Sequence, residues 1–96
     1  MNLDEAVAAA ERELRAMENP DLPLRLDSRE LWQERSWCYV FPFNSVAFLD
    51  RDEILQVIPT GPLIVPKNGS EPWVSPSAFP VKQVLDEYER DHGISG

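Results

Sequence analysis

The sequence has little of the residues on which catalysis, disulfide scaffolds and membrane insertion depend. Its 96 residues contain one cysteine, Cys38, and one histidine, His92. A single cysteine excludes an internal disulfide and a multi-cysteine zinc site. No run reaches about 18 consecutive apolar residues, which excludes a membrane-spanning helix. The chain opens with Met1-Asn2-Leu3-Asp4-Glu5, acidic where a secretory signal carries positive charge, so we expect a cytoplasmic protein.

Basic residues are also scarce. Nine Lys and Arg stand against 17 Asp and Glu, which gives a formal net charge of −8, and the acidic excess is spread along the whole chain. A negative field repels phosphate backbones and anionic lipids, so direct binding to nucleic acid or membrane is disfavoured. The same field speeds encounter with a basic partner. Net charge also keeps a small protein soluble, so the charge alone does not decide between these roles.

Neither Cys38 nor His92 lies in a pattern typical of a catalytic site. Cys38 alternates with aromatic residues in a predicted strand, a position typical of a small buried hydrophobe. His92 is expected in the last turn of a C-terminal helix, where a positive charge interacts favourably with the helix dipole. A nucleophile also needs a base within reach. We therefore predict that the protein is not an enzyme and that it needs no cofactor.

Asp50, Asp52 and Glu53 form an acidic cluster that could indicate a calcium or magnesium site. A calcium loop that begins at Asp50 requires a Gly at its sixth position and a Glu at its twelfth. Leu55 and Gly61 stand at those positions. The cluster therefore predicts a solvated turn and no metal site.

The first segment predicts an amphipathic helix over residues 3–18. Asn2 and Glu5 have the spacing of a capping box. Asn19-Pro20 ends the helix, because the residue before a proline avoids the α region. The apolar stripe of this helix consists of Leu3, Val7, Ala10, Leu14 and Met17.

Short strands are expected in the middle of the chain. Residues 37–43 carry apolar side chains on both alternating faces, which predicts a central strand covered on its two sides. Pro42 lacks a ladder donor, so pairing is expected to end or bulge there. Residues 24–34 are expected to form the neighbouring strand, with a turn at Arg35-Ser36.

A hairpin is expected further along the chain. Residues 63–65 and 73–74 are apolar, and Asn68-Gly69 between them is typical of a type I′ turn. The preceding stretch, residues 44–58, fits either a short strand followed by a loop or a helical turn near residues 52–56.

The last segment predicts a second helix. It is expected to begin at Pro80, because the N–H that proline lacks would have no partner within the helix at a first helical position. It is expected to end at Gly93. Its apolar face consists of Val81, Val84, Leu85 and Tyr88. A helix, three or four short antiparallel strands and a helix define an α+β domain, which we expect to form two layers.

Aromatic residues concentrate in the centre of the sequence. Trp37, Phe41 and Phe43 are expected to fill the core between the sheet and the helices. Trp32 and Trp73 lie near strand ends beside polar or proline residues. These two side chains fit either the core or an exposed contact with a partner.

Several segments resemble a known bacterial family, the immunity protein 35 family. Trp37-Cys38-Tyr39-Val40-Phe41-Pro42-Phe43-Asn44-Ser45 is similar to its aromatic strand, which ends in an Asn-Ser pair. Gly61-Pro62-Leu63-Ile64-Val65-Pro66-Lys67-Asn68-Gly69 is similar to a second strand and the turn that follows it. Phe79-Pro80 and Glu87-Tyr88-Glu89 fit its final helix. The resemblance implies a single immunity-protein-like domain over residues 1–96.

The resemblance also implies a function. Such a protein binds a cognate toxin domain of a bacterial polymorphic toxin system and neutralises it by protein–protein occlusion. A nuclease toxin must be basic to bind nucleic acid, so a basic nuclease domain is one candidate partner of this acidic chain. The oligomeric state is left open. We expect the interface on acidic and aromatic surface residues, namely Asp50, Asp52, Glu53, Glu71, Trp73, Asp86, Glu87 and Asp91.

Two other functions fit the same residues. A small chaperone-like or assembly module would bind many clients weakly and have no dedicated toxin. A small-ligand-binding domain would use the three tryptophans to line a pocket instead of a core.

Overall fold

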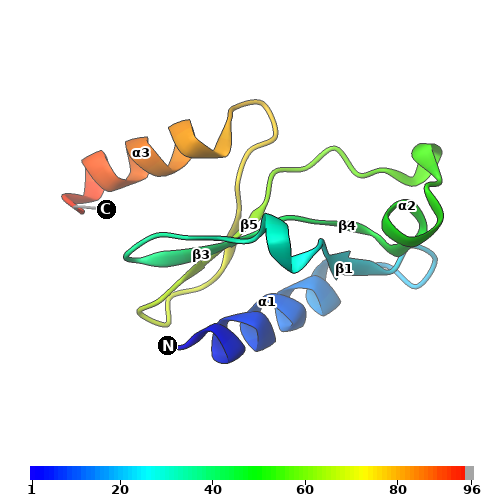
Figure 1. Cartoon of the computed structure of the whole chain (residues 1–96), viewed down its shortest axis with the longest axis horizontal. Coiled ribbons are helices and arrows are strands. Elements are labelled where there is room, and N and C mark those ends of the chain that lie inside the picture. Colours follow the sequence, from blue (N-terminus) through cyan, green and yellow to red (C-terminus); the bar gives the residue numbers. More distant parts are fainter. Residues whose placement is uncertain (95–96) are drawn as a thin grey trace.

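A four-stranded antiparallel sheet lies between the two long helices in the computed structural model, which describes residues 1–94 (Figure 1). The first helix packs on one face of the sheet and the last helix on the other. The strands run in the order β2 (Gln33–Glu34), β3 (Cys38–Phe41), β5 (Leu63–Pro66) and β6 (Trp73–Val74). The helices are α1 (Leu3–Met17) and α3 (Val81–His92).

Helix α1 forms as its sequence predicts. The Asn2 side chain accepts from the Glu5 backbone N–H at 2.9 Å, and the Glu5 carboxylate accepts from the Asn2 N–H at 3.0 Å, which completes the capping box. Glu18 follows as the C-cap in an extended conformation, just before Asn19-Pro20. The predicted end of the helix is therefore confirmed to within one residue.

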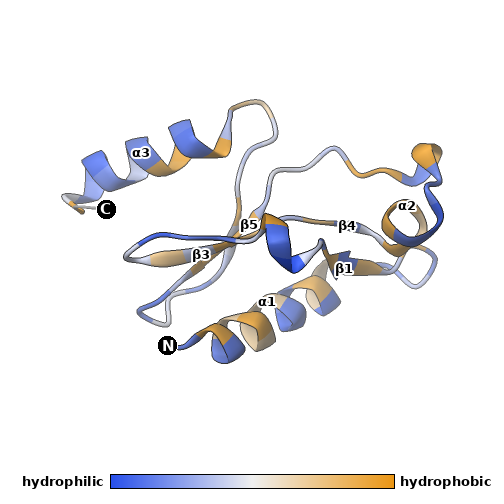
Figure 2. Cartoon of the chain, viewed as in Figure 1, coloured by the Kyte–Doolittle hydropathy of each residue, from blue (hydrophilic) through white to orange (hydrophobic). Residues whose placement is uncertain are grey.

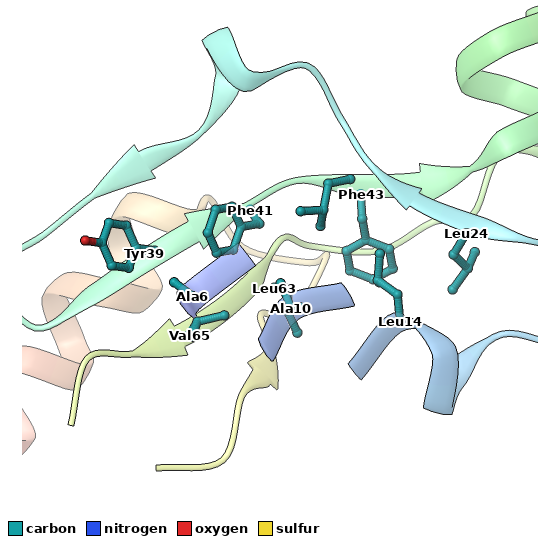
Figure 3. Close-up of a cluster of buried hydrophobic side chains, with 10 residues drawn as sticks. Ala6, Ala10, Leu14, Leu24, Tyr39, Phe41, Phe43, Leu63 and Val65 are labelled. Carbon is teal, nitrogen blue, oxygen red and sulfur yellow. The ribbon is translucent and has the colours of Figure 1, made fainter. Parts of the chain in front are cut away.

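Strands β3 and β5 bury side chains on both of their faces. Tyr39, Phe41, Leu63 and Val65 join Ala6, Ala10 and Leu14 of α1 in the larger cluster, which Figure 3 shows from close by. On the opposite face, Cys38, Val40 and Ile64 pack against Leu85 of α3. The predicted α+β class, with a helix at each end of an antiparallel meander, is confirmed. The domain nevertheless has three layers rather than the expected two, because the helices cover opposite faces.

The segment expected as one strand over residues 24–34 is divided. Its first part, β1 (Leu24–Leu26), pairs with β4 (Phe43–Ser45) in a separate two-stranded sheet. A 3₁₀ turn, η1 (Arg29–Leu31), intervenes before β2 pairs with β3. The prediction of one continuous strand is wrong. The predicted interruption at Pro42 is confirmed, and it separates β3 from β4 so that each finds its own partner.

Helical turns follow β4 directly. Helix α2 (Val46–Arg51) has Ser45 as its N-cap, and a second 3₁₀ turn, η2 (Ile54–Gln56), comes after it. The alternative of a helical turn near residues 52–56 is therefore confirmed, whereas α2 was not expected.

The predicted hairpin of β5 and β6 is present, but its turn differs. Gly69 has a φ of +87°, whereas Asn68 is not among the residues with positive φ. A type I′ turn requires positive φ at both central residues, so residues 67–72 form a longer connection. At the end of α3, Gly93 has a φ of +67° and caps the helix as predicted. Pro80 is the N-cap residue rather than the first helical residue.

Candidate functional site

A loop after α2 exposes large aliphatic side chains at one end of the molecule. We call residues 50–57 the projecting loop; it contains the end of α2, Asp52 and η2. Leu55 is 96% exposed, Ile54 73% and Val57 43%. Figure 2 shows this apolar segment beside hydrophilic residues, away from the sheet and from α3. The loop therefore contributes little to either hydrophobic cluster.

Local hydrogen bonds explain how the chain folds here. The Ser45 hydroxyl accepts from the Phe48 N–H at 3.1 Å and caps α2. Asp52 then adopts a left-handed conformation, with φ 54° and ψ 31°, and its N–H donates to the Phe48 carbonyl at 3.1 Å. This left-handed residue ends α2, and the chain turns into η2.

The base of the projecting loop is held by two consecutive residues, which we call the Asn44–Ser45 clamp. The Ser45 hydroxyl donates to the Gln56 carbonyl at 2.7 Å. The Asn44 side chain accepts from the Ile58 N–H at 2.8 Å and donates to the Ile58 carbonyl at 3.1 Å. Ser45 is fully buried. The Asn-Ser pair of the family resemblance thus binds the backbone on which the exposed side chains stand.

Acidic side chains flank the exposed aliphatic residues. The Asp50 carboxylate accepts from Arg25 of β1, with Nε at 2.9 Å. Glu53 lies 3.4 Å from Arg51 in a looser ion pair. Asp52 has no ion-pair partner among residues 1–94. Arginines therefore engage Asp50 and Glu53, and the described residues contain no group of three His, Cys, Asp or Glu side chains that could hold a metal ion.

The other residues predicted at an interface lie elsewhere. Glu71 is exposed on the connection between β5 and β6. Trp73 is half-buried, with its ring stacked 5.5 Å from that of Tyr88 on α3. Glu87 and Asp91 are exposed on α3. The structure therefore groups the loop carboxylates and separates them from the residues of α3 (Figure 1).

Asp86 belongs to a polar network that fastens α3 to the sheet. Arg35 Nη1 donates to Asp86 at 2.8 Å and to Glu89 at 2.7 Å. Trp37 Nε1 donates to the same Glu89 oxygen at 2.9 Å. Hydrogen bonds from Arg35 and then Trp37 lower the pKa of Glu89, and those from Lys82 and then Arg35 lower the pKa of Asp86. This network holds the helix in place, so Asp86 is less available to a partner than the loop carboxylates.

The tryptophans pack within the protein. Trp32 contacts Phe41 edge-on at 5.0 Å, and its Nε1 donates to the Asp27 carbonyl at 2.9 Å. Trp37 stacks on Tyr88 at 4.5 Å with the planes 10° apart. Both rings are half-buried. The packed rings support the core alternative for these tryptophans more than an exposed contact.

Cys38 and His92 occupy unrelated environments. Burial raises the pKa of the Cys38 thiol to about 11, so the thiol is protonated at neutral pH. His92 is exposed; its Nδ1 lies 2.9 Å from the Tyr88 carbonyl, and its ring stacks on that of Tyr88 at 3.9 Å. Neither residue has the environment that activates a nucleophile or its base.

The sequence analysis found the acidic residues of the projecting loop but not the aliphatic ones. Residues 54–58 were expected only as part of a loop or of a helical turn, with no role assigned to their apolar side chains. One signal was available, since Pro59 follows immediately and Pro62 stands three residues further on, and neither proline can donate to a strand ladder. An apolar run that is too short for a helix and is followed by two prolines is a candidate for exposure.

The comparison with family models places this α+β domain among the immunity proteins, a class of non-enzymatic inhibitors, which implies a cognate toxin as the partner. The chain is a member of the immunity protein 35 family, and the family model matches residues 4–91. The expected family is thus confirmed. No curated protein and no solved structure matches the chain. Across residues 1–94, the helices are too short or too polar to cross a membrane.

Proposed function

We propose that this protein neutralises its cognate toxin by covering part of the toxin surface, without any chemical step. The projecting loop carries this proposal, because it presents acidic and aliphatic side chains that the fold itself does not use. A stable interface takes about 800 Å² from each partner. The whole molecule exposes 6050 Å², so a large share of one end of the domain would be covered.

The charge of the protein favours a basic toxin. A net charge of −8 accelerates encounter with a positive surface and disfavours wrong partners of the same sign. A nuclease domain carries such a surface where it binds nucleic acid. An acidic protein bound there would exclude the substrate, so we propose a basic nuclease domain as the class of toxin.

The proposed contacts are the acidic and aromatic residues predicted from the sequence. The loop residues Asp50, Asp52 and Glu53 are the primary candidates, since they stand together and exposed. The other predicted contacts lie on the β5–β6 hairpin and on α3, and they would take part only in a toxin interface that extends beyond the projecting loop. They are Glu71, Trp73, Asp86, Glu87 and Asp91.

Co-expression tests the proposed function directly. Each gene that neighbours the coding sequence is expressed alone and with this protein, and growth is measured. We expect one neighbouring product to arrest growth and this protein to restore it, with a one-to-one complex on size-exclusion chromatography. Association should slow as ionic strength rises. If no neighbouring product is neutralised, or if many unfolded proteins are bound weakly instead, the proposal is wrong.

A further inference from the structure

We infer that the projecting loop docks into the toxin with Leu55 and Ile54 in an apolar pocket bordered by basic side chains. This inference rests on the proposed function and assigns the element and the partner chemistry that the family alone does not give. It depends on three features of the loop: exposure, a fixed backbone and charge.

These two side chains are exposed side by side. Leu55 and Ile54 are adjacent, and they are the two most exposed large aliphatic residues among those described, at 96% and 73%. Other exposed apolar residues, such as Leu31 and Phe79, stand singly on different elements. Contiguous exposed apolar residues with a polar border are typical of protein-binding sites.

The backbone that presents them is fixed. The Asn44–Ser45 clamp binds Gln56 at the end of the loop and Ile58 just after it, with side-chain hydrogen bonds of 2.7–3.1 Å. The start of the loop is held by the left-handed cap at Asp52 and by Arg25 on Asp50. Because the loop is ordered before it binds, association loses less conformational entropy. A fixed, exposed aliphatic pair is suited to enter a pocket that is already formed.

The charge around the pair identifies the occupant. Arg25 pairs with Asp50 and Arg51 with Glu53, which leaves Asp52 with no ion-pair partner among residues 1–94, on a protein whose net charge is −8. A second copy of this chain would bring like charges together, and an anionic membrane would repel the loop. In a protein with a basic border around an apolar pocket, the pocket would bury the aliphatic side chains and the basic border would pair with the acidic ones.

Two matched variants test this assignment. Leu55→Ser removes the aliphatic anchor from η2, and Leu31→Ser makes the same change in the other 3₁₀ turn, η1, where Leu31 is 52% exposed. The probe is the purified toxin domain that the wild-type protein neutralises in the growth assay. Binding is measured by surface plasmon resonance, and thermal unfolding shows that both variants are folded.

We expect Leu55→Ser to raise the Kd by about 30-fold or more, as for a central interface residue. Leu31→Ser should stay within about threefold of the wild type, as an exposed residue outside the interface. Asp52→Asn, which removes the charge and keeps a residue type that tolerates the left-handed conformation, should slow association, and this effect should disappear at high salt.

Failure of this inference is distinct from failure of the proposed function. If the wild-type protein binds and protects but Leu55→Ser binds equally well, the loop is not the docking element and only this inference is overturned. If the wild-type protein neither binds nor protects, the proposed function itself is wrong.

Discussion

Gly61 stands at the closest approach between two segments of the chain, and we predict that Gly61→Ala will strongly destabilise the protein. A Cβ atom at this position would lie 2.1 Å from the Ser75 carbonyl oxygen, 2.8 Å from its carbon and 3.0 Å from the Pro76 oxygen. These are backbone atoms, which cannot rotate away as the end of a side chain can. The Ser75 N–H also donates to the Pro62 carbonyl at 2.8 Å, which holds the two segments together.

The size of the effect follows from this geometry. Overpacking in a well-packed site costs about 1–3 kcal/mol, and the contact with rigid backbone places Gly61→Ala near the upper value. Unfolding entropy of about 2.1 cal/mol/K per residue gives about 0.2 kcal/mol/K for a chain of 96 residues. A loss of about 3 kcal/mol therefore lowers the Tm by about 15 °C.

Thermal unfolding followed by circular dichroism measures this loss, and Gly69→Ala is the matched control. Gly69 has a φ of +87° and nothing within 4 Å of a Cβ, so its substitution adds backbone strain of about 1 kcal/mol without a clash. We expect a fall in Tm of about 5 °C for this control. If Gly61→Ala lowers the Tm no more than Gly69→Ala, the close approach does not limit the packing of these segments and the reasoning is refuted.

Three further predictions concern single side chains. Ser45→Ala should lower the Tm by about 10 °C, because α2 loses its N-cap and the projecting loop loses an anchor. The control is Ser28→Ala, which should change the Tm little because the Ser28 side chain makes no cap hydrogen bond. Equal changes in Tm for the two variants would contradict the role of the Ser45 hydroxyl. The Cys38 thiol, buried and with a pKa of about 11, should react with a thiol reagent at pH 8 only after denaturant is added; rapid labelling of the native protein would refute its burial. Glu89→Gln should destabilise the protein at pH 7. Because Arg35 lowers the pKa of Glu89 in the folded state from 4.5, its stabilisation exists above pH 4.5 and is lost as the pH falls through the lowered value. The difference between wild type and variant should therefore narrow in acid, and a constant difference would contradict the pairing.

Local signals in the sequence predict the parts of the fold that depend on neighbouring residues. The capping box at Asn2 and the proline at position 20 define α1, because each acts within one helical turn. Gly93 defines the end of α3 in the same way. Pro42 marks a break in pairing because it lacks an N–H, whatever strand lies beside it.

The remaining features depend on contacts between distant residues. The apolar pattern of residues 24–34 cannot reveal that β1 pairs with β4 while β2 pairs with β3, since the choice is made by the break at Pro42 and by the turn η1. Helix α2 is short and contains Val46 and Phe48, which favour strands; its Ser45 cap and its contact with η2 override that preference. A strand with two apolar faces implies that other elements cover both faces, but it does not reveal which helix covers which face.

The sequence likewise reveals some residues of the candidate site and not others. Acidity is read directly from Asp50, Asp52 and Glu53, so these residues could be named from the sequence. The exposure of Leu55 could not, because an aliphatic side chain is assigned to a core unless the structure shows that the core lies elsewhere. Here one buried cluster lies between α1 and the sheet and a second between α3 and the sheet, and the clamp residues hold the loop outside both.

The separation of the projecting loop from the core has a consequence for specificity. The two buried clusters contain no residue of the loop, and the clamp binds backbone atoms of Gln56 in the loop and of Ile58 just after it, not the exposed side chains. Substitutions at Ile54 and Leu55 therefore change the surface that a partner meets while leaving the packing of the fold and the hydrogen bonds of the clamp intact. In the proposed docking mode, changes in a few exposed loop residues would alter which toxin is bound, provided that Asn44 and Ser45 are retained to keep the loop fixed.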